Sequence, residues 1–203
     1  TDRLVVGLDV GYEGDDETVA QPRRGKKTLL SHAVRKKDGP DVARWLLDLL
    51  FGTPLQTGLA KAGEKPLVIV DKNGYGASAY DQLKRDSRIE CYGVNVSERP
   101  TAKAPPGWPE GFNHLRDQLW WGAREWLKEG GTLPPQASKL RADLLAVRLL
   151  NPTAAGRMQV EGKAEMKKRL GRSPDHGDAF CLAIFTPPPK PKVEVGQVNL
   201  HRR

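Results

Sequence analysis

Short apolar runs and helically spaced apolar residues alternate along this chain. Three compact runs rich in β-branched residues predict buried strands over 3–10, 66–71 and 89–96. Shorter runs predict a hairpin and a further strand over 17–21 and 28–34. Apolar residues at helical spacing predict helices over 40–52, 112–131 and 138–149, and a last helix from near Ser173 through 185.

Strands that alternate with helices are typical of an α/β domain with a mixed central sheet flanked by helices. We expect one domain over 1–185, in which 53–65 and 97–112 lack regular structure and 157–161 forms a short strand. The tail, 186–203, is rich in proline and basic, and we expect it to be extended or disordered.

Composition narrows the class of protein. The 203 residues carry a net charge of +8, which favours a polyanionic partner, nucleic acid first. A soluble protein that is basic for other reasons is the alternative.

No apolar run approaches the roughly 20 residues that span a bilayer, and the first residues do not form a signal peptide, so we expect no membrane partner and no secretion. The two cysteines are far apart, which disfavours a disulfide scaffold or a zinc site. The first residue is Thr, which we interpret as a fragment or a processed chain.

Four aspartates stand where acidic residues are unusual. Asp9 lies inside the first predicted strand and Asp71 ends the second, while Asp175 and Asp178 are three residues apart at the start of the last helix. Each has a plain explanation by itself: a satisfied polar residue, a strand end, or an acid favoured by the helix dipole. If the four converge, they need cations, and carboxylate oxygens suit Mg²⁺ or Mn²⁺. Two such ions about 4 Å apart would clamp a phosphodiester for displacement.

Other charged and aromatic residues are less specific. A basic run precedes the acidic helix, and beside a metal cluster we prefer a phosphate-contacting patch to a merely solvated face: Lys163, Lys167, Lys168, Arg169 and Arg172. His176 is expected on another side of the helix, and Asp15 and Asp16 as solvated turn residues. The tryptophans at helical spacing are interpreted mainly as core: Trp45, Trp120, Trp121 and Trp126.

Four stretches in order resemble a known family over residues 3–185: RLVVGLDVGYEGDDETV, LVIVDKNGYGASAYDQLK, FNHLRDQLWWGAREWLKEG and GRMQVEGKAEMKKRLGRSPDHGDAF. They are similar to the ribonuclease-H-like fold in its RuvC-type branch, and more closely to the nuclease domain of the large terminase subunit of tailed bacteriophages. The resemblance implies that Asp9 and Asp71 are the two strand ligands of the metal and that the last ligand is Asp175 or Asp178, with a slight preference for Asp178. Gly177 stands where many relatives carry alanine.

The resemblance also implies a function. Such a domain is a metal-dependent endonuclease that cuts concatemeric viral DNA. It would use two Mg²⁺ or Mn²⁺ ions and cut with low sequence specificity. Its partners would be double-stranded DNA, a packaging ATPase domain, the portal and the small terminase subunit, in the host cytoplasm during phage assembly. The sequence GxxxxGKS/T does not occur in this chain, so the motor is not part of it.

Two other readings of the sequence stay open. A non-catalytic DNA-binding module would explain the basic charge but not the four aspartates. The stretch VVGLDVGYEG also resembles the phosphate-binding hairpin of actin-like and sugar-kinase ATPases, which need a second such lobe that this chain lacks.

Overall fold

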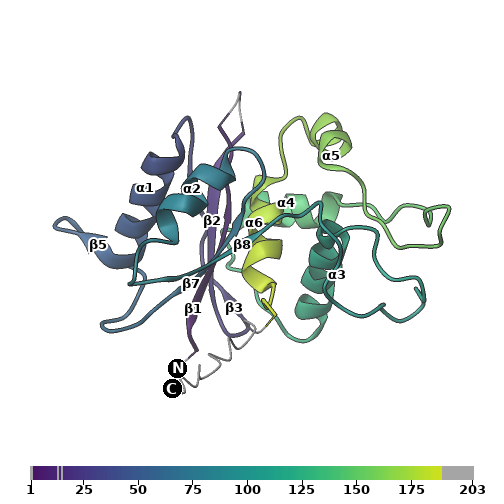
Figure 1. Cartoon of the computed structure of the whole chain (residues 1–203), viewed down its shortest axis with the longest axis horizontal. Helices are drawn as coiled ribbons and strands as arrows, with labels where there is room; N and C mark the ends of the chain where they lie inside the picture. The colour runs from purple at the N-terminus through teal and green to yellow at the C-terminus, as the bar shows by residue number, and fades with distance from the viewer. Residues whose placement is uncertain (1, 13, 15, 189–203) are drawn as a thin grey trace, which may run out of the picture.

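A mixed six-stranded sheet forms the centre of the part of the chain that this computed structural model describes, residues 2–12, 14 and 16–188 (Figure 1). The strand order is β3-β2-β1-β7-β8, with β4 also paired to β2. β1 runs antiparallel to β2 and parallel to β7, and β7 runs parallel to β8. The strands of this sheet are β1 (Leu4–Asp9), β2 (Thr18–Arg24), β3 (Lys27–Thr28), β4 (His32–Val34), β7 (Leu67–Asp71) and β8 (Glu90–Val94).

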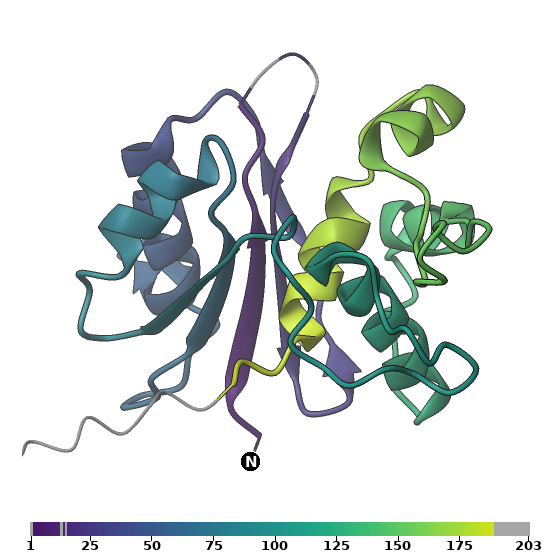
Figure 2. The ribbon, with the colours of Figure 1, turned by 45° about the vertical axis from the view of Figure 1, so that its right-hand side comes forward.

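Helices cover both faces of the sheet (Figures 1 and 2). One face carries α1 (Gly39–Phe51) and α2 (Gly76–Leu83). The other face carries α6 (Asp175–Ile184), against which α3 (Leu115–Lys128) and α4 (Ser138–Ala146) pack, and α5 (Lys163–Leu170) lies near the beginning of α6. This arrangement confirms the α/β class and the mixed sheet that the sequence predicted.

The alternation of side chains along β1 divides the core in two. Leu4, Val6 and Leu8 pack with the apolar faces of α1 and α2, whereas Val5 belongs to the core shared with α3 and α6. Asp9 follows the same alternation as Val5 and therefore belongs to the α6 side of the sheet. The period of two that is visible in the sequence thus decides which layer of helices the aspartate meets.

Gly7 sets how closely α6 approaches the sheet. A Cβ atom built at this position would lie 2.1 Å from the carbonyl oxygen of Ala179 and 2.4 Å from the backbone nitrogen of Ala183. Any larger residue would push α6 away from β1, so the glycine lets a helix backbone rest directly on a strand. The close contact brings the first turn of α6 next to the end of β1.

The structure differs from the sequence prediction in several local features. The loop 53–65 takes part in a two-stranded hairpin made of β5 (Gly52–Thr53) and β6 (Gln56–Thr57). The segment 157–161 forms only isolated bridges, because its partners are single residues of two irregular segments. The predicted helix 138–149 ends at Ala146.

The beginning of α6 also corrects a prediction. Pro174 occupies the N-cap position and no side chain caps the helix, so Ser173 lies one residue too early to act as the cap that its identity favours. Asp175 is therefore the first residue of the helix. Among the described residues, no helix is both long and apolar enough to cross a membrane. Residues 189–203 of the predicted tail lie outside the described part of the chain.

Candidate metal centre

Three of the four predicted aspartates meet around one ammonium group. The Nζ atom of Lys163, the first residue of α5, lies 3.0 Å from an oxygen of Asp9, 3.1 Å from one of Asp175 and 3.1 Å from one of Asp178. Asp9 ends β1, and the other two aspartates begin α6. Residues that are more than 150 positions apart in the chain therefore form one pocket of negative charge that already holds a cation.

Asp71 borders the same pocket from the neighbouring parallel strand, β7. A cavity of about 240 Å³ is lined by Asp71 together with Asp9, Asp178 and Lys163. One oxygen of Asp71 accepts a hydrogen bond of 3.1 Å from the backbone N–H of Asn73. Parallel strands end at the same edge of a sheet, which is why the ends of β1 and β7 place their carboxylates in one cavity.

Each helical carboxylate is held by one oxygen and offers the other. The backbone N–H of Glu17 donates to Oδ2 of Asp175 at 2.8 Å, and Oδ1 of Asp175 faces Lys163. The indole N–H of Trp120 donates to Oδ1 of Asp178 at 3.2 Å, and Oδ2 faces Lys163. The guanidinium of Arg116 lies 3.8 Å from that same Oδ1. Both carboxylates thus have a fixed orientation toward the cation.

The electrostatics of the site reflect this crowding. Burial, together with the charges of Asp178 and Asp175, raises the pKa of Asp9 to about 7, although Lys163 opposes the shift. Burial is also the main reason why the pKa of Asp71 is raised. For Lys163, burial alone would lower the pKa, but the surrounding carboxylates raise it well above its ordinary value. The ammonium of Lys163 is therefore charged, and its charge offsets the repulsion among the surrounding carboxylates.

In the described part of the chain, the groups around the ammonium of Lys163 are all carboxylate oxygens. Among the described residues, no group of three or more acidic, histidine or cysteine side chains is arranged so that it could hold a metal ion as it stands. The distances of 3.0–3.1 Å to Lys163 are those of hydrogen-bonded ion pairs, and Mg²⁺ needs oxygens at about 2.1 Å. Three carboxylates surround the ammonium and a fourth, Asp71, lines the same cavity, and carboxylate oxygens are the ligands that Mg²⁺ and Mn²⁺ prefer.

The residues of the predicted basic patch do not form one surface in the structure, because they have different environments. Lys163 points into the acidic pocket. Lys167 and Lys168 remain at the surface, with 47% and 74% of their side chains exposed, and pair with Asp16 and Glu165.

Two arginines of the same set brace the framework. Arg169 pairs with Glu161 and donates to the carbonyl of Ala146, at the end of α4. Arg172 pairs at 2.6 Å with Asp143, whose other oxygen accepts from the backbone N–H of Gly177 in α6. Arg169 thus ties α5 to α4, and Arg172 ties the segment before α6 to α4.

His176 lies on a different side of α6 from the carboxylates, as the sequence predicted. Its ring contacts Ser31 at 2.8 Å and Glu17 at 3.2 Å. Glu17 in turn pairs with Lys139 and Arg35. Burial raises the pKa of Glu17, but the hydrogen bonds from Lys139 and His176 outweigh it and lower the pKa to about 2. This network fixes the loop whose N–H holds Asp175. Asp16, expected as a solvated turn residue, pairs with Lys167, and Asp15 lies outside the described residues.

Sequence reasoning missed the residues that orient the carboxylates. Trp120 is buried, as its helical spacing indicated, but its N–H also serves Asp178. Arg116, one turn earlier on α3, stacks its guanidinium 5.5 Å from the Trp120 ring. Because Arg116 and Trp120 are four residues apart, the sequence places both on one face of the helix. It does not show that both approach the same carboxylate, Asp178.

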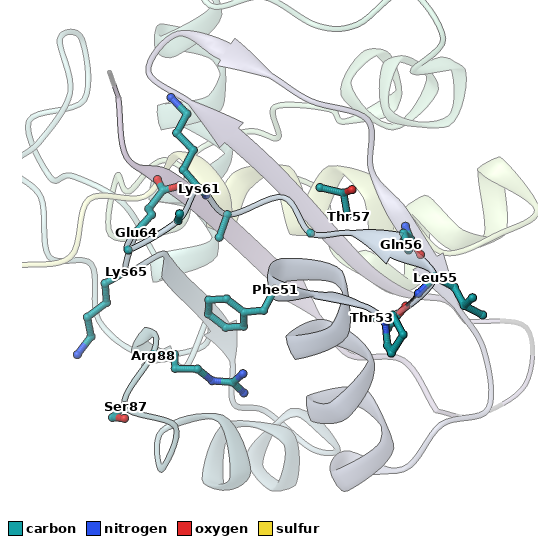
Figure 3. A pocket seen from close by; sticks show the side chains of 15 residues that line it. Phe51, Thr53, Leu55, Gln56, Thr57, Lys61, Glu64, Lys65, Ser87 and Arg88 are labelled. Carbon is teal, nitrogen blue, oxygen red and sulfur yellow. Dashed lines mark hydrogen bonds between the residues drawn. The ribbon is translucent and has the colours of Figure 1, made fainter.

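A cavity larger than the acidic pocket lies elsewhere in the described part of the chain. A hollow of about 900 Å³ borders the end of α1, the β5–β6 hairpin and the loop 58–65 (Figure 3). Arg88 lies over the Phe51 ring there at 4.5 Å and is paired with Asp86, while Leu55 at the tip of the hairpin is 97% exposed. No carboxylate of the acidic pocket lines this hollow, so size does not mark the functional site.

Comparison with solved structures places the fold. No protein-family model and no curated protein matches the sequence. The nuclease domain of the large terminase subunit gp2 of bacterial virus Sf6 matches with a TM-score of 0.69 at 20% identity, covering 92% of this chain and 89% of that chain. A mutant of that domain, solved with manganese and beta-thujaplicinol, gives the same values. The large terminase nuclease of thermophilic phage G20c with bound cobalt matches with a TM-score of 0.59 at 16% identity, covering 90% and 80%.

The chain therefore has a ribonuclease-H-like fold, as its sequence predicted. More particularly, it has the fold of the nuclease domains of phage large terminase subunits.

Proposed function

We propose that this chain is a metal-dependent endonuclease that cuts double-stranded DNA during the packaging of a phage genome. The observation that carries the proposal is the convergence of Asp9, Asp175 and Asp178 on one cation position, with Asp71 in the same cavity. The fold supports it, because terminase nuclease domains of this fold have been solved with manganese, calcium, cobalt and magnesium.

The four aspartates would hold two divalent ions, Mg²⁺ or Mn²⁺. When bound, such ions supply the positive charge that activates water and stabilises the leaving oxygen in phosphodiester hydrolysis. Asp175 and Asp178 contribute preset oxygens, since Glu17 and Trp120 fix the other oxygen of each. The chain thus restricts how the carboxylates turn before any ion arrives.

The basic residues serve two different purposes in this proposal. Lys163 neutralises the carboxylates in the metal-free protein, and the binding ions displace its ammonium group. Lys167 and Lys168, exposed on α5, contact DNA phosphates beside the pocket. Arg169 and Arg172, which the sequence placed in the same DNA-binding set, contribute to it mainly by bracing α4, α5 and α6.

The substrate would be concatemeric viral DNA in the host cytoplasm, cut with little sequence preference because phosphate contacts carry no sequence information. A packaging ATPase domain, the portal and the small terminase subunit would be its partners. A non-catalytic DNA-binding module and an actin-like ATPase fragment are the alternatives that an assay must exclude.

The proposal is tested with the full 203-residue chain and a supercoiled plasmid. We expect Mn²⁺, titrated into the mixture, to produce nicked and then linear DNA, and EDTA to stop the reaction. The ends should carry 5′ phosphates and be joined by a DNA ligase, and sequenced ends should show no dominant motif.

Two outcomes would contradict the proposal. A gel shift that is indifferent to metal, with no cutting over the whole Mn²⁺ titration, would favour the binding module. ATP hydrolysis by the chain, again without cutting, would favour the ATPase fragment.

Trp120→Phe is expected to weaken Mn²⁺ binding about tenfold, because second-layer hydrogen bonds orient metal ligands. The substitution keeps most of the buried ring and removes the N–H that holds Asp178. Isothermal titration calorimetry with Mn²⁺ measures the affinity, and thermal unfolding checks that the fold persists.

Trp126→Phe is the matched control. Trp126 is also buried on α3 and packs edge-to-face on Phe180 at 5.6 Å. We expect this variant to lose packing energy but keep its Mn²⁺ affinity. Equal affinities of the Trp120→Phe variant and the wild type would show that the indole does not position Asp178.

A further inference from the structure

Two exposed tyrosines stack on each other at the edge of the sheet that carries the acidic pocket. The ring centroids of Tyr12 and Tyr75 are 4.7 Å apart with an interplanar angle of 33°. Their exposed fractions are 42% and 46%. In the described part of the chain, every other large apolar side chain with comparable exposure is a leucine. An aromatic pair with this much of its side chains exposed is therefore unusual on this surface.

The tyrosines belong to the two loops that follow the aspartate-bearing strands. Tyr12 comes three residues after Asp9, and Tyr75 comes four residues after Asp71. Because β1 and β7 are adjacent and parallel, both loops leave the sheet at the same edge. The stacked rings thus follow the same strand ends that carry both aspartates of the cavity.

A tightly packed glycine stands next to each tyrosine. Gly11 precedes Tyr12, and a Cβ atom there would lie 2.9 Å from the carbonyl oxygen of Glu17. Gly76 follows Tyr75, and a Cβ atom there would lie 1.8 Å from the carbonyl oxygen of Asp71. Each loop is closed too tightly for a side chain at its glycine, so the backbone next to each tyrosine has a defined path.

We propose that the Tyr12–Tyr75 pair stacks on an unpaired nucleobase next to the phosphate that occupies the acidic pocket, an inference that rests on the proposed nuclease function. A nucleobase is the planar group that stands within one nucleotide of any DNA phosphate. Stacking on tyrosine tolerates every base, since all bases have a π-face. Bases inside an intact duplex hide their faces against each other, so the pair selects DNA that is locally open.

The test compares two DNA duplexes of the same length, one fully paired and one with a short mismatched bubble. Binding of the full chain is measured by fluorescence anisotropy in Ca²⁺, at equal ionic strength. We expect the wild type to bind the bubble about tenfold more tightly. The double variant Tyr12→Leu/Tyr75→Leu should bind both duplexes equally, whereas Tyr12→Phe/Tyr75→Phe should keep the preference because the rings remain.

Leu55→Ala is the matched control, since it removes an exposed apolar side chain from the distant β5–β6 hairpin. It should keep the preference for the bubble. A second measurement needs no variant: 2-aminopurine placed in the bubble should lose fluorescence when the wild type binds, as expected for a stacked base.

Three results would overturn the inference: equal binding of both duplexes by the wild type, an unchanged preference in the leucine double variant, or no quenching of 2-aminopurine. The plasmid assay separates this failure from failure of the proposed function. Cutting without a bubble preference rejects the stacking site alone, and a tyrosine-dependent preference without cutting rejects the nuclease alone.

Discussion

Asp9→Asn is expected to reduce plasmid cutting by about three orders of magnitude. The substitution preserves the shape of the side chain and removes one negative charge from the pocket. One carboxylate oxygen becomes an amide oxygen, which is a weaker ligand, and the other is replaced by an NH₂ group, whose N–H bonds repel Lys163 and any metal ion. Initial rates of nicking in Mn²⁺ measure the effect.

The matched control is Asp81→Asn, the same chemical change at a carboxylate that is exposed on α2 and paired with Lys84. This variant should cut like the wild type. Full cutting by the Asp9→Asn variant would remove Asp9 from the proposed site and with it the idea of a shared cation.

The fold should survive Asp9→Asn, and its stability should depend less on pH. Burial raises the pKa of Asp9 from about 4 to about 7, so the folded metal-free protein holds a proton that the unfolded chain has already lost. The wild type therefore loses stability through this group as the pH rises from about 4 to about 7. Urea unfolding in EDTA at pH 5 and pH 7.5 should show a smaller loss for the variant.

The strand and helix positions of the aspartates followed from local patterns. A strand that alternates with a period of two places Asp9 with Val5 and Gly7, and the structure has this alternation. The spacing of Asp175 and Asp178 puts both on one side of a helix. Such features depend only on neighbours in the chain, which is why the sequence is sufficient to predict them.

Lys163 was beyond local reasoning. In the sequence it opens a basic run in which Lys167 and Lys168 follow the same helical pattern, so nothing distinguishes it as a half-buried counter-charge of the aspartates. The irregular segment 147–162 carries the chain back so that α5 begins at the acidic pocket. The direction of a side chain at the start of a helix depends on that long-range path.

The role of Gly177 in packing was likewise not predictable from the sequence alone. From the sequence it is a helix residue that costs about 1 kcal/mol relative to alanine. In the structure, a Cβ atom at this position would lie 2.6 Å from the Trp120 ring and 2.9 Å from the Cβ of Asp143. The glycine therefore admits the indole that bonds Asp178, a role that only the contact between α3 and α6 reveals.

Lys163→Met is expected to destabilise the metal-free protein and to strengthen its binding of Mn²⁺. Without the ammonium, Asp9, Asp175 and Asp178 repel one another and the pKa of Asp9 rises further, since Lys163 is what lowers it. Removing one partner of a buried ion pair costs about 3–5 kcal/mol. Because 39% of the lysine side chain is exposed, we expect about 1–2 kcal/mol, or roughly 5 °C in the unfolding temperature.

Metal binding should change in the opposite direction. In the wild type an ion must displace the ammonium from among three carboxylates, and in the variant the position is free. Calorimetric titration with Mn²⁺ in the absence of DNA should therefore give an affinity about tenfold higher for the variant. Saturating Mn²⁺ should also raise the unfolding temperature of the variant more than that of the wild type.

Lys167→Met provides the matched control, one helical turn further along α5. Within the described residues, Lys167 pairs with Asp16 near the surface, and such exposed pairs contribute less than about 1 kcal/mol. This variant should keep both the stability and the Mn²⁺ affinity of the wild type. If Lys163→Met left the Mn²⁺ affinity unchanged or abolished it, the ammonium would not occupy the metal position, and the carboxylates around it would be a structural ion-pair network.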